Sequence, residues 1–349
     1  MVKPLRVLQA IAGQRQGGAE AFFERLAAAL HRSGVDQRVV IRRDAGRAER
    51  LRRAGLETQE VPFAGALDVM TRLRLVRGLR DYRPDVALSW MSRAAAMMPP
   101  RWLAGDRAVR VGRLGGHYNL KFYRGCDHLV GNTEDIVHYI RRQGWPMDRA
   151  HYLPNFVDVT AAAPVDRATL QTPPDAIVAL ALGRFHLNKA FDVLLDALAL
   201  TPGLFLWIGG DGELRGELEA QIARLGLGPR VRLLGWRDDV PALFAACDIA
   251  VCPSRHEPLG NVILEGWAQG RPVVAAESAG PAALIKNDET GLLVPIDEPA
   301  ALAAALQRLI ADPSTRTRLA EAGRAAYQSR FTESAVVGRY LDFFNAVIR

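Results

Sequence analysis

Short apolar runs alternate with longer amphipathic stretches along the first half of the chain. The apolar runs predict buried strands at residues 5–12, 37–42, 58–62, 85–90, 109–114 and 126–132. Between these runs, hydrophobic positions recur at helical spacing. They predict one helix that ends near residue 33 and three others at 47–54, 69–82 and 133–143. Strands that alternate with helices of this length pair in parallel and are covered on both faces. The pattern therefore predicts an α/β fold with a doubly wound parallel sheet.

The same pattern starts again after a polar, proline-bearing segment at residues 160–174, which has the composition of a linker. Apolar runs return at residues 177–182, 205–212, 231–236, 248–252, 272–276 and 291–295, and two helices are expected between 299 and 329. A chain of 349 residues is long enough for two such domains. We expect a first domain at 1–160, a second at 175–330 and a last helix at 331–349.

The composition is that of an ordinary globular protein, with 49% hydrophobic and 24% charged residues. The three cysteines, Cys126, Cys247 and Cys252, are too scattered to indicate a disulfide framework or a zinc site. No window approaches the length of an apolar membrane span, and the N-terminus enters a strand without a signal-like segment. These features predict a cytoplasmic protein, with peripheral attachment to the inner face of the cytoplasmic membrane left open.

The net charge of +7 is concentrated in the first half of the chain. Residues 1–160 contain 27 Lys and Arg against 16 Asp and Glu, whereas the remainder contains 18 against 22. A basic half indicates an anionic partner, which by charge alone is a membrane surface, a phosphorylated glycolipid or a nucleic acid. The alternative is a general preference for arginine without functional meaning.

The predicted helix at 69–82 has a high density of arginine. Its basic residues and the one that follows are Arg72, Arg74, Arg77, Arg80 and Arg83, and its apolar residues include Met70, Leu73, Val76 and Leu79. Such a helix can lie on an acidic membrane face. Packing of the apolar residues on the sheet, with the arginines in solvent, is the more economical explanation. An apolar, irregular piece at 97–102 is a candidate for holding a lipid-linked acceptor.

Two glutamates flank a predicted helix N-terminus in the segment 248–272. Glu257 lies in the loop after a strand, and Glu265 lies about one and a half turns into the following helix. Between them, Gly260 allows a ligand to approach closely, and the N–H groups of Gly260, Asn261 and Val262 would be free to bind an anion. Acids next to an anion cradle suit a sugar joined to a phosphate, although a solvated loop and helix start would also contain them.

A loop after the strand at 177–182 contains two cations, Arg184 and Lys189. A planar guanidinium and a compact ammonium can hold one diphosphate from two sides and offset the charge that grows as it leaves. Two solvated loop cations are the alternative. Asp238 and Asp239 lack a third spaced ligand for a metal, and they predict a helix N-cap instead.

Two loops of the first half are further candidates. Gly17 and Gly18 follow the first strand, but their loop does not match the dinucleotide or P-loop patterns. His117 follows the strand at 109–114, where open α/β sheets place their ligand crevice. Taken alone, a glycine turn is common before helices and a single histidine is usually structural.

Together these motifs resemble the retaining glycosyltransferases of family 4, or glycosyl transferases group 1, which have the GT-B fold. Glu257 and Glu265, with seven residues between them that include Pro-Leu-Gly-Asn, are similar to the family's Glu-x7-Glu signature. The run at 268–275 is similar to the family's usual continuation. The resemblance covers the chain from about residue 5 to about residue 345.

Three more segments resemble the family's pattern. The loop that ends in Glu20 is similar to a Gly-Gly-x-Glu loop near the donor phosphates and the acceptor. The segment with Arg184 and Lys189 is similar to a Gly-Arg-x4-Lys-Gly element, except that Ala190 replaces the final glycine. Residues 153–158 are similar to a segment that closes the first domain, but Phe156 replaces a glycine there, which puts the local turn geometry in doubt.

The resemblance implies two Rossmann-like domains that face a central cleft, with the last helix packed back on the first domain. It implies a nucleotide-diphosphate sugar donor, most commonly a UDP-sugar, and a hydroxyl of a glycan or lipid-linked acceptor, with retention at the anomeric carbon. No cofactor and no obligatory metal are implied. No nucleic acid partner is expected, because no recognisable motif interleaves the arginines with stacking aromatics.

The resemblance also implies roles for single residues. Arg184, Lys189 and the helix start at Gly260 would stabilise the departing diphosphate, which would itself take the acceptor proton. Glu257 would orient the donor sugar, Glu265 the ribose, and His117 the sugar from the opposite wall. The other expected members of the donor site are Gly17, Gly18, Leu234, Gly235, Leu259 and Asn261, with Leu234 and Gly235 at the base.

Other functions remain open at this point. A nucleotide-sugar epimerase or a phosphorylase has the same fold, but the Glu-x7-Glu element argues against the first and the chain length against the second. A degenerate transferase that only binds is an alternative of another class. The basic first half suggests work on a bacterial envelope glycolipid, such as lipopolysaccharide core or a lipid-linked polysaccharide intermediate.

Overall fold

The computed structural model describes residues 4–13, 17–65, 67–157 and 162–348. Its contacts divide the chain into two compact units. Unit 1 consists of Met1–Phe156 and Glu333–Arg349, and unit 2 consists of Val157–Thr332. Unit 1 is therefore discontinuous, because the chain returns to it for its last helix.

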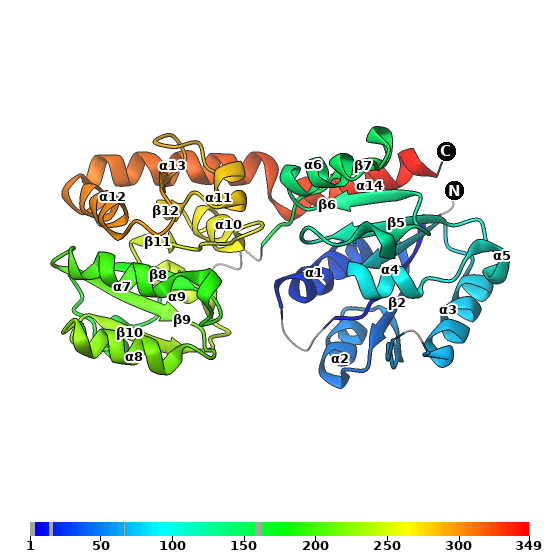
Figure 1. Cartoon of the computed structure of the whole chain (residues 1–349), viewed down its shortest axis with the longest axis horizontal. Helices are drawn as coiled ribbons and strands as arrows, with labels where there is room; N and C mark the ends of the chain where they lie inside the picture. Colours follow the sequence, from blue (N-terminus) through cyan, green and yellow to red (C-terminus); the bar gives the residue numbers. More distant parts are fainter. Residues whose placement is uncertain (1–3, 14–16, 66, 158–161, 349) are drawn as a thin grey trace. The chain divides into compact units, whose positions relative to one another are not determined.

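Unit 1 is built on a seven-stranded sheet with the order β3-β2-β1-β4-β5-β6-β7 (Figure 1). Neighbouring strands pair in parallel; β1 and β4, for example, run in register from Val7 opposite Val86 to Ile11 opposite Trp90. All five residues of β4 are buried, as expected of a central strand covered on both faces. The strands are β1 (Arg6–Ile11), β2 (Asp36–Arg42), β3 (Glu57–Val61), β4 (Val86–Trp90), β5 (Val109–Leu114), β6 (His128–Gly131) and β7 (Ala150–Tyr152).

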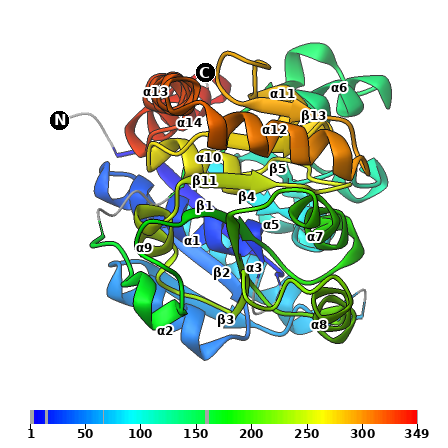
Figure 2. The ribbon, with the colours of Figure 1, turned by 90° about the vertical axis from the view of Figure 1, so that its left-hand side faces the viewer.

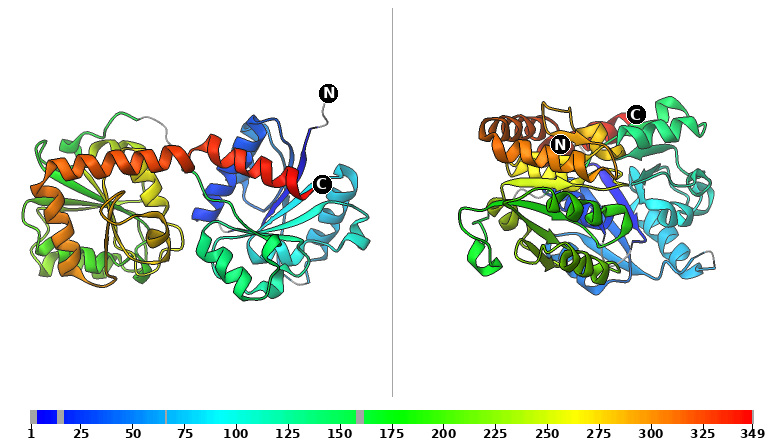
Figure 3. Two further views of the ribbon diagram at one scale, coloured as in Figure 1. Left: turned by 90° about the horizontal axis from the view of Figure 1, so that it is seen from above. Right: turned by 60° about the vertical axis from the view of Figure 1, so that its left-hand side comes forward.

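Helices cover both faces of this sheet. Buried residues of α1, α2 and α14 form one core, and those of α3, α4 and α5 form the core of the other face. A further cluster lies under α6. The helix α14 contacts α1 and can be followed in Figure 3. The helices are α1 (Gly18–Arg32), α2 (Ala45–Arg53), α3 (Val69–Tyr82), α4 (Met91–Met97), α5 (Arg101–Ala104), α6 (Glu134–Arg142) and α14 (Glu333–Val347).

Unit 2 repeats this plan with a six-stranded sheet in the order β10-β9-β8-β11-β12-β13. All of its strand pairs are parallel. The strands are β8 (Ile177–Leu182), β9 (Leu204–Gly209), β10 (Val231–Gly235), β11 (Ile249–Cys252), β12 (Val273–Ala276) and β13 (Leu292–Val294).

The helices of unit 2 also form two layers. Buried residues of α7, α8 and α12 make one core, whereas those of α9, α10 and the end of α13 make the other. The helices α12 and α13 contact each other and lie side by side (Figures 1 and 2). The helices are α7 (Phe191–Ala199), α8 (Arg215–Arg224), α9 (Val240–Ala246), α10 (Asn261–Ala268), α11 (Ala279–Leu284), α12 (Pro299–Ala311) and α13 (Pro313–Arg330).

Local sequence explains where several helices begin. The side chains of Asp44, Asp68, Thr133 and Asp312 each accept a hydrogen bond from an N–H in the first turn of the following helix. This satisfies one of the donors that a helix start leaves unpaired.

The predicted α/β fold with two parallel sheets is confirmed, and each predicted apolar run in it contains a strand. Phe156, in place of a glycine, is buried against Phe22 with a ring-centroid distance of 5.3 Å and so adds to the core of unit 1. From residue 162 on, the expected linker packs on unit 2, where Arg167 donates to the Ala246 carbonyl and to Asp248. Of the described helices, none is long and apolar enough to cross a bilayer.

Candidate functional site

The candidate residues follow the strands at the reversal point of each sheet. In unit 2 the strand order reverses between β8 and β11, and the loops after these two strands contain Lys189 and Glu257. In unit 1 the reversal lies between β1 and β4, and the loop after β1 leads to Gly17. The carboxyl ends of parallel strands at such a point leave a crevice for ligands. The fold therefore places the predicted loops where a ligand site is expected in each unit.

An ion pair between Lys189 and Glu257 joins the two loops of unit 2. Lys189 ends a 3₁₀ turn, and its Nζ donates to one carboxylate oxygen of Glu257. The other oxygen accepts from the backbone N–H of Gly260, at 3.1 Å. Both side chains are largely buried. The predicted free N–H of Gly260 is thus wrong for this structure, because Glu257 already occupies that donor.

The charge on Lys189 is stabilised despite its burial. Burial lowers the pKa of Lys189, but the charge of Glu257 and the hydrogen bond to it act in the opposite direction and raise the pKa above its ordinary value. Glu265 and Cys252 add smaller contributions of the same sign. Burial raises the pKa of the Cys252 thiol to about 11, so this cysteine is neutral near pH 7. The loop pair therefore offers a fixed cation and not a nucleophilic thiolate.

Arg255 also connects the loop after β11 with the loop after β8. Its guanidinium donates to both carboxylate oxygens of Asp192, at 2.9 and 2.6 Å, and to the Leu187 carbonyl at 2.9 Å. It also pairs with Asp297. The N–H of His256 donates to the Asn188 carbonyl. Sequence reasoning missed Arg255, because its acids lie far away along the chain and no short motif links them.

The other predicted donor residues of unit 2 differ in their exposure. Arg184 is exposed and makes no hydrogen bond or ion pair with the part of the chain that the structure describes, so it is free to bind an anion. Leu259 is buried, whereas Leu234, Gly235, Asn261 and Glu265 are half-buried. Gly235 ends β10 with a positive φ of 67°, and its carbonyl accepts from the N–H of Gly210.

The 3₁₀ turn that ends in Lys189 explains why small residues stand at positions 183 and 190. A Cβ on Gly183 would lie 3.1 to 3.3 Å from three carbons of the Lys189 stem, so glycine leaves room for the lysine there. Ala190 has a left-handed backbone with φ 51°, a conformation that glycine adopts without cost. The alanine retains the turn that the family's glycine makes, with local backbone strain.

In unit 1, the glycine loop folds around the carboxylate of Glu20. Cβ atoms on Gly13 and Gly17 would lie 2.5 and 2.3 Å from the oxygens of this carboxylate. Gly17 is the N-cap of α1 and Gly18 its first residue, while Gln14, Arg15 and Gln16 of the predicted loop lie outside the described residues. The two glycines thus make space for a buried acid at the helix start.

His117 lies after β5 and makes two specific contacts. Its Nε2 lies 2.7 Å from a carboxylate oxygen of Asp135, and its ring stacks on Tyr139 at 4.4 Å between centroids. The histidine is about half exposed, so one ring edge remains open to a ligand. Asp135 and Tyr139 escaped the sequence analysis, although an acid in the first turn of α6 was visible.

A buried arginine lies just before His117. Arg113 donates to the Tyr340 hydroxyl of α14 at 2.9 Å and to Asn155 at 2.5 Å. Its guanidinium lies over the rings of Phe22 and Trp90. These contacts connect β5 with α1, β4 and α14, and so they hold the end of the strand that carries His117.

Acidic and metal-ligating side chains were also compared with the sequence expectations. Within the described residues, no group of three or more His, Cys, Asp or Glu side chains is placed to hold a metal ion. Asp239 is the N-cap residue of α9 as predicted, but its carboxylate makes no capping bond. It binds the Arg237 guanidinium instead, with distances of 2.7 and 2.5 Å. Arg237 offers a charge-assisted pair, which is stronger than a neutral cap.

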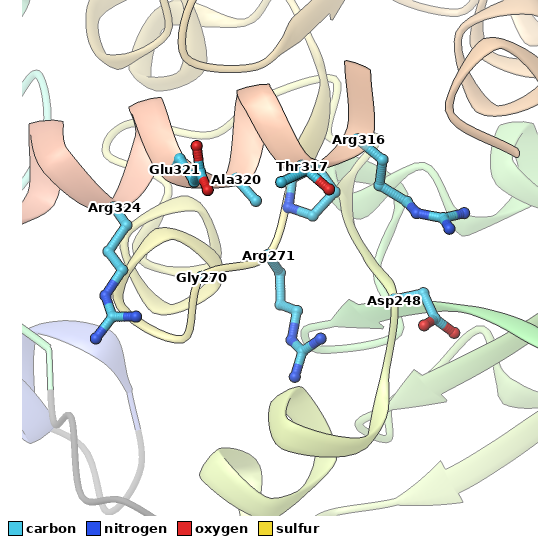
Figure 4. Close-up of a pocket in the computed structure, with 9 residues that line it drawn as sticks. Asp248, Gly270, Arg271, Arg316, Thr317, Ala320, Glu321 and Arg324 are labelled. Carbon is cyan, nitrogen blue, oxygen red and sulfur yellow. The ribbon is translucent and has the colours of Figure 1, made fainter. Parts of the chain in front are cut away.

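A separate cavity of about 270 Å³ lies at the opposite edge of unit 2, near the amino ends of β11 and β12 (Figure 4). Its lining includes Arg271, Arg316, Arg324 and Asp248. Arg271 also donates to the Ala245 carbonyl at 2.9 Å. None of the predicted site residues lines this cavity, so it is distinct from the lysine and glutamate cluster.

Two family models match nearly the whole chain. The model described as "Glycosyl transferases group 1" matches residues 163–326, and that of a "Glycosyl transferase 4-like domain" matches residues 17–155. The boundary between them falls close to the boundary between the two units. Each unit therefore corresponds to one matched model.

Curated relatives are similar over almost their full length. The lipopolysaccharide core biosynthesis glycosyltransferase LpsE of Rhizobium meliloti is 39% identical over 331 residues, covering 94% of this chain and 96% of the relative. LpsD of the same organism is 38% identical over 337 residues, covering 95% of each.

Solved structures show the same fold at low identity. Anabaena Alr3699/HepE, in complex with UDP and glucose, matches with a TM-score of 0.84 and 23% identity, covering 98% of this chain and 100% of that one. A glycosyltransferase from Rickettsia africae matches with a TM-score of 0.89 and 18% identity, covering 99% of each chain. The GT-B fold expected from the sequence is confirmed.

Proposed function

Because the chain belongs to the glycosyl transferases group 1 family, we propose that it transfers a sugar from a nucleotide-diphosphate sugar to a hydroxyl of a lipopolysaccharide core acceptor. The relatives LpsE and LpsD, which are named for lipopolysaccharide core biosynthesis, support this choice of acceptor. The single observation that carries the proposal is the cluster of Lys189, Glu257 and Gly260 at the reversal point of unit 2.

We propose that unit 2 holds the donor. Arg184 is exposed without a partner among the described residues, and Lys189 is a buried cation one loop turn away. A diphosphate between them would receive one planar and one compact cation. Glu265 lies close enough to Lys189 to raise its pKa, which suits the proposed role beside the ribose. UDP is the proposed nucleotide, and the complex of the Anabaena neighbour with UDP supports it by analogy of fold.

The proposed reaction retains the configuration at the anomeric carbon. The bond from this carbon to the diphosphate oxygen breaks, a bond to the acceptor oxygen forms, and the hydroxyl proton passes to the leaving diphosphate. Lys189 and Arg184 would stabilise the negative charge that develops on that diphosphate. Since Lys189 is paired with Glu257 before a donor arrives, donor binding would release Glu257 to accept from sugar hydroxyls. His117, oriented by Asp135 and Tyr139, would contact the sugar from unit 1.

Unit 1 is the proposed acceptor half. Its sequence is basic, and a phosphorylated glycolipid is anionic. Gly17 and Gly18, at the start of α1, would contact the donor phosphates and the acceptor. A lipid-linked acceptor would bring the enzyme to the inner face of the cytoplasmic membrane, where we propose peripheral contact. Neither a cofactor nor a metal is part of this proposal.

Thermal unfolding with ligands tests the donor site. We expect UDP or its sugars to raise the unfolding midpoint selectively over GDP and ADP, because a ligand that binds only the folded state stabilises it with the logarithm of its excess. Lys189→Ala and Glu265→Ala should lose most of this rise. Lys286→Ala, which removes an exposed lysine of the same unit, is the matched control.

Product release separates the alternative functions. A transferase releases free UDP from the donor only when a core oligosaccharide acceptor is added. An epimerase would change the sugar without releasing UDP, and a degenerate binding protein would do neither. A stable, folded protein that binds no nucleotide of the panel would contradict the proposed donor site.

A further inference from the structure

Large apolar side chains are exposed on α3 and α5 of unit 1 and at Leu67, just before α3. Leu67 is 95% exposed and Trp102 is 81% exposed, which is rare for such large apolar groups. The exposed set here comprises Leu67, Val69, Met70, Leu73, Trp102 and Leu103. Four of them, Leu67, Val69, Met70 and Leu73, fall within seven residues of the chain, and clustered exposed apolar side chains often mark a site for a partner. We call the outer side of α3 and α5, with Leu67, the α3–α5 surface.

The outward face of α3 is apolar at its start and basic toward its end. Thr71, Leu75 and Leu79 are buried and point toward the sheet. Val69, Leu73, Arg77 and Arg80 recur at helical spacing on the exposed side. The sequence expectation that the apolar residues all pack on the sheet is correct for Val76 and Leu79, but it is wrong for Met70 and Leu73.

Hydrogen bonds fix α5 beside α3. The guanidinium of Arg80 donates to the carbonyls of Leu103, at 2.8 Å, and Ala104, at 3.2 Å. The two helices contact each other and lie together at the edge of unit 1 (Figure 1). Trp102 therefore belongs to a short helix that Arg80 holds against the C-terminal part of α3.

Positive charge surrounds the apolar residues. Arg72, Arg74 and Arg77 are exposed on α3. The acid at the start of the helix, Asp68, is engaged by Thr71 and by the N–H of Ala64. Asp81 pairs with Arg77 alone, at 3.3 Å. The α3–α5 surface thus combines exposed apolar side chains with excess positive charge.

We infer that the α3–α5 surface docks on an anionic lipid bilayer. Leu67, Leu73 and Trp102 would enter the headgroup region, while the arginines meet lipid phosphates and keep their charged ends in water. Charge complementarity favours an anionic membrane over a second copy of this basic surface, which would repel itself. The inference rests on the proposed function for its purpose, the approach to a lipid-linked acceptor, but its physical basis is independent of turnover.

Vesicle sedimentation tests the inference with the full chain. We expect binding to vesicles of phosphatidylglycerol and phosphatidylethanolamine, weakening as salt is raised, and little binding to phosphatidylcholine vesicles. Each arginine near an anionic surface contributes about a fivefold gain in partitioning. Reversing Arg74 and Arg77 to Glu should therefore lower binding by more than tenfold. Reversing Arg52 and Arg53 on α2, which are also exposed, is the charge-matched control.

Two apolar variants test insertion. Leu73→Ser should weaken vesicle binding several-fold, whereas Leu200→Ser, which changes a similarly exposed leucine of unit 2, should not. Anionic vesicles should shift the fluorescence of the wild type to shorter wavelength. Trp102→Phe should lose most of this shift but still sediment, because phenylalanine inserts without indole emission.

Several outcomes would overturn the inference. These are no sedimentation of the wild type with anionic vesicles, equal loss in the α2 control, or a dimer in solution that Leu73→Ser dissociates. Each variant must retain the wild-type unfolding midpoint and its rise with UDP. A protein that binds UDP but not vesicles contradicts the membrane surface alone, and one that binds vesicles but not UDP contradicts the donor site alone.

Discussion

The two units have the same strand order around their reversal points but use charge differently. In unit 2, opposite charges meet inside the loops after the strands, where Lys189 pairs with Glu257 and Arg255 with Asp192. In unit 1, the carboxylate of Glu20 is buried against Gly13 and Gly17 at the start of α1, and exposed arginines lie on α3. One scaffold thus supports a compact site rich in paired charges and a broad basic surface.

This difference in the arrangement of charge indicates which kind of ligand suits each unit. Ion pairs hold the loops of unit 2 in a fixed geometry, which suits a small ligand such as a diphosphate. The bound anion only has to replace one carboxylate as the partner of a cation. Exposed arginines on an outer helix, such as Arg72 and Arg74, suit a large anionic partner whose geometry is not fixed. Three substitutions test this contrast between the units, and their expected effects decrease from the first to the third.

The first substitution removes the cation of the unit 2 site. Lys189→Ala should lower turnover by about two to three orders of magnitude, as loss of one preorganised stabilising group does in other enzymes. The fold should persist, since Glu257 keeps its bond from Gly260. Steady-state rates of UDP release with acceptor measure the effect, and circular dichroism checks the fold.

The exposed lysine at 286 provides the control for that experiment. Lys286→Ala should leave turnover unchanged, because among the described residues this side chain pairs only with Glu289 at the surface, at 3.6 Å. Near-normal turnover in Lys189→Ala would remove Lys189 from the mechanism. A loss in both variants would instead point to a general dependence on the charge of unit 2.

The second substitution tests unit 1 through its buried arginine. Arg113→Met should lower the free energy of unfolding by about 2 to 4 kcal/mol, because hydrogen bonds from a buried charge to Tyr340 and Asn155 are lost. Urea unfolding measures the change. Hydrogen exchange should show faster exchange in α14 than in α13, which belongs to unit 2.

Arg53→Met is the control for this change. Arg53 is exposed and pairs only with Glu49 on its own helix, so its loss should alter stability by less than about 0.5 kcal/mol. If Arg113→Met were equally mild, the guanidinium would not hold α14 to unit 1. Uniformly faster exchange in both α13 and α14 would show that the effect is not confined to unit 1.

The strands, and the placement of the candidate loops at the carboxyl edge of the sheet, could be predicted because they depend on local patterns. Runs such as residues 177–182 are apolar on both faces, and the loops that follow them must lie at the carboxyl edge of a parallel sheet. Lys189 and Glu257 could thus be assigned to one edge from their place after β8 and β11. Their direct ion pair could not, because 68 residues separate them and only the packed sheet brings them together.

Short elements and exposure were harder to predict. The helix α5 has four residues, too few for a hydrophobic period, and the piece around it was expected to be irregular. Met70 and Leu73 have the spacing of core residues but point outward, since Thr71 and Leu75 occupy the inner face. Hydrophobic periodicity predicts a helix and its apolar face, but tertiary packing decides which residues of that face are buried.

The third substitution has the smallest expected effect and concerns a histidine pair found in unit 1 alone within the described structure. His128 Nδ1 lies 3.0 Å from His151 Nε2, and His151 packs on Phe343 of α14. Burial, then the charges of His128 and Arg141, lower the pKa of His151 to about 4, and Asp148 opposes this weakly. Burial also lowers the pKa of His128, with Arg149 acting in the same direction and Asp127 and Asp148 against it.

These shifts predict that unit 1 loses stability in mild acid. The unfolded chain binds a proton near pH 6.5, whereas folded His151 stays neutral until about pH 4, so its contribution is present above 6.5 and is lost as the pH falls through this window. His151→Phe should make the free energy of unfolding less dependent on pH between 6.5 and 4, by roughly 1 kcal/mol after allowance for partial exposure. His138→Phe, at an exposed position of α6, should leave the dependence unchanged. Urea unfolding at pH 7, 6 and 5 measures the slope, and equal slopes in the wild type and His151→Phe would mean that acid acts elsewhere than at the α14 contact.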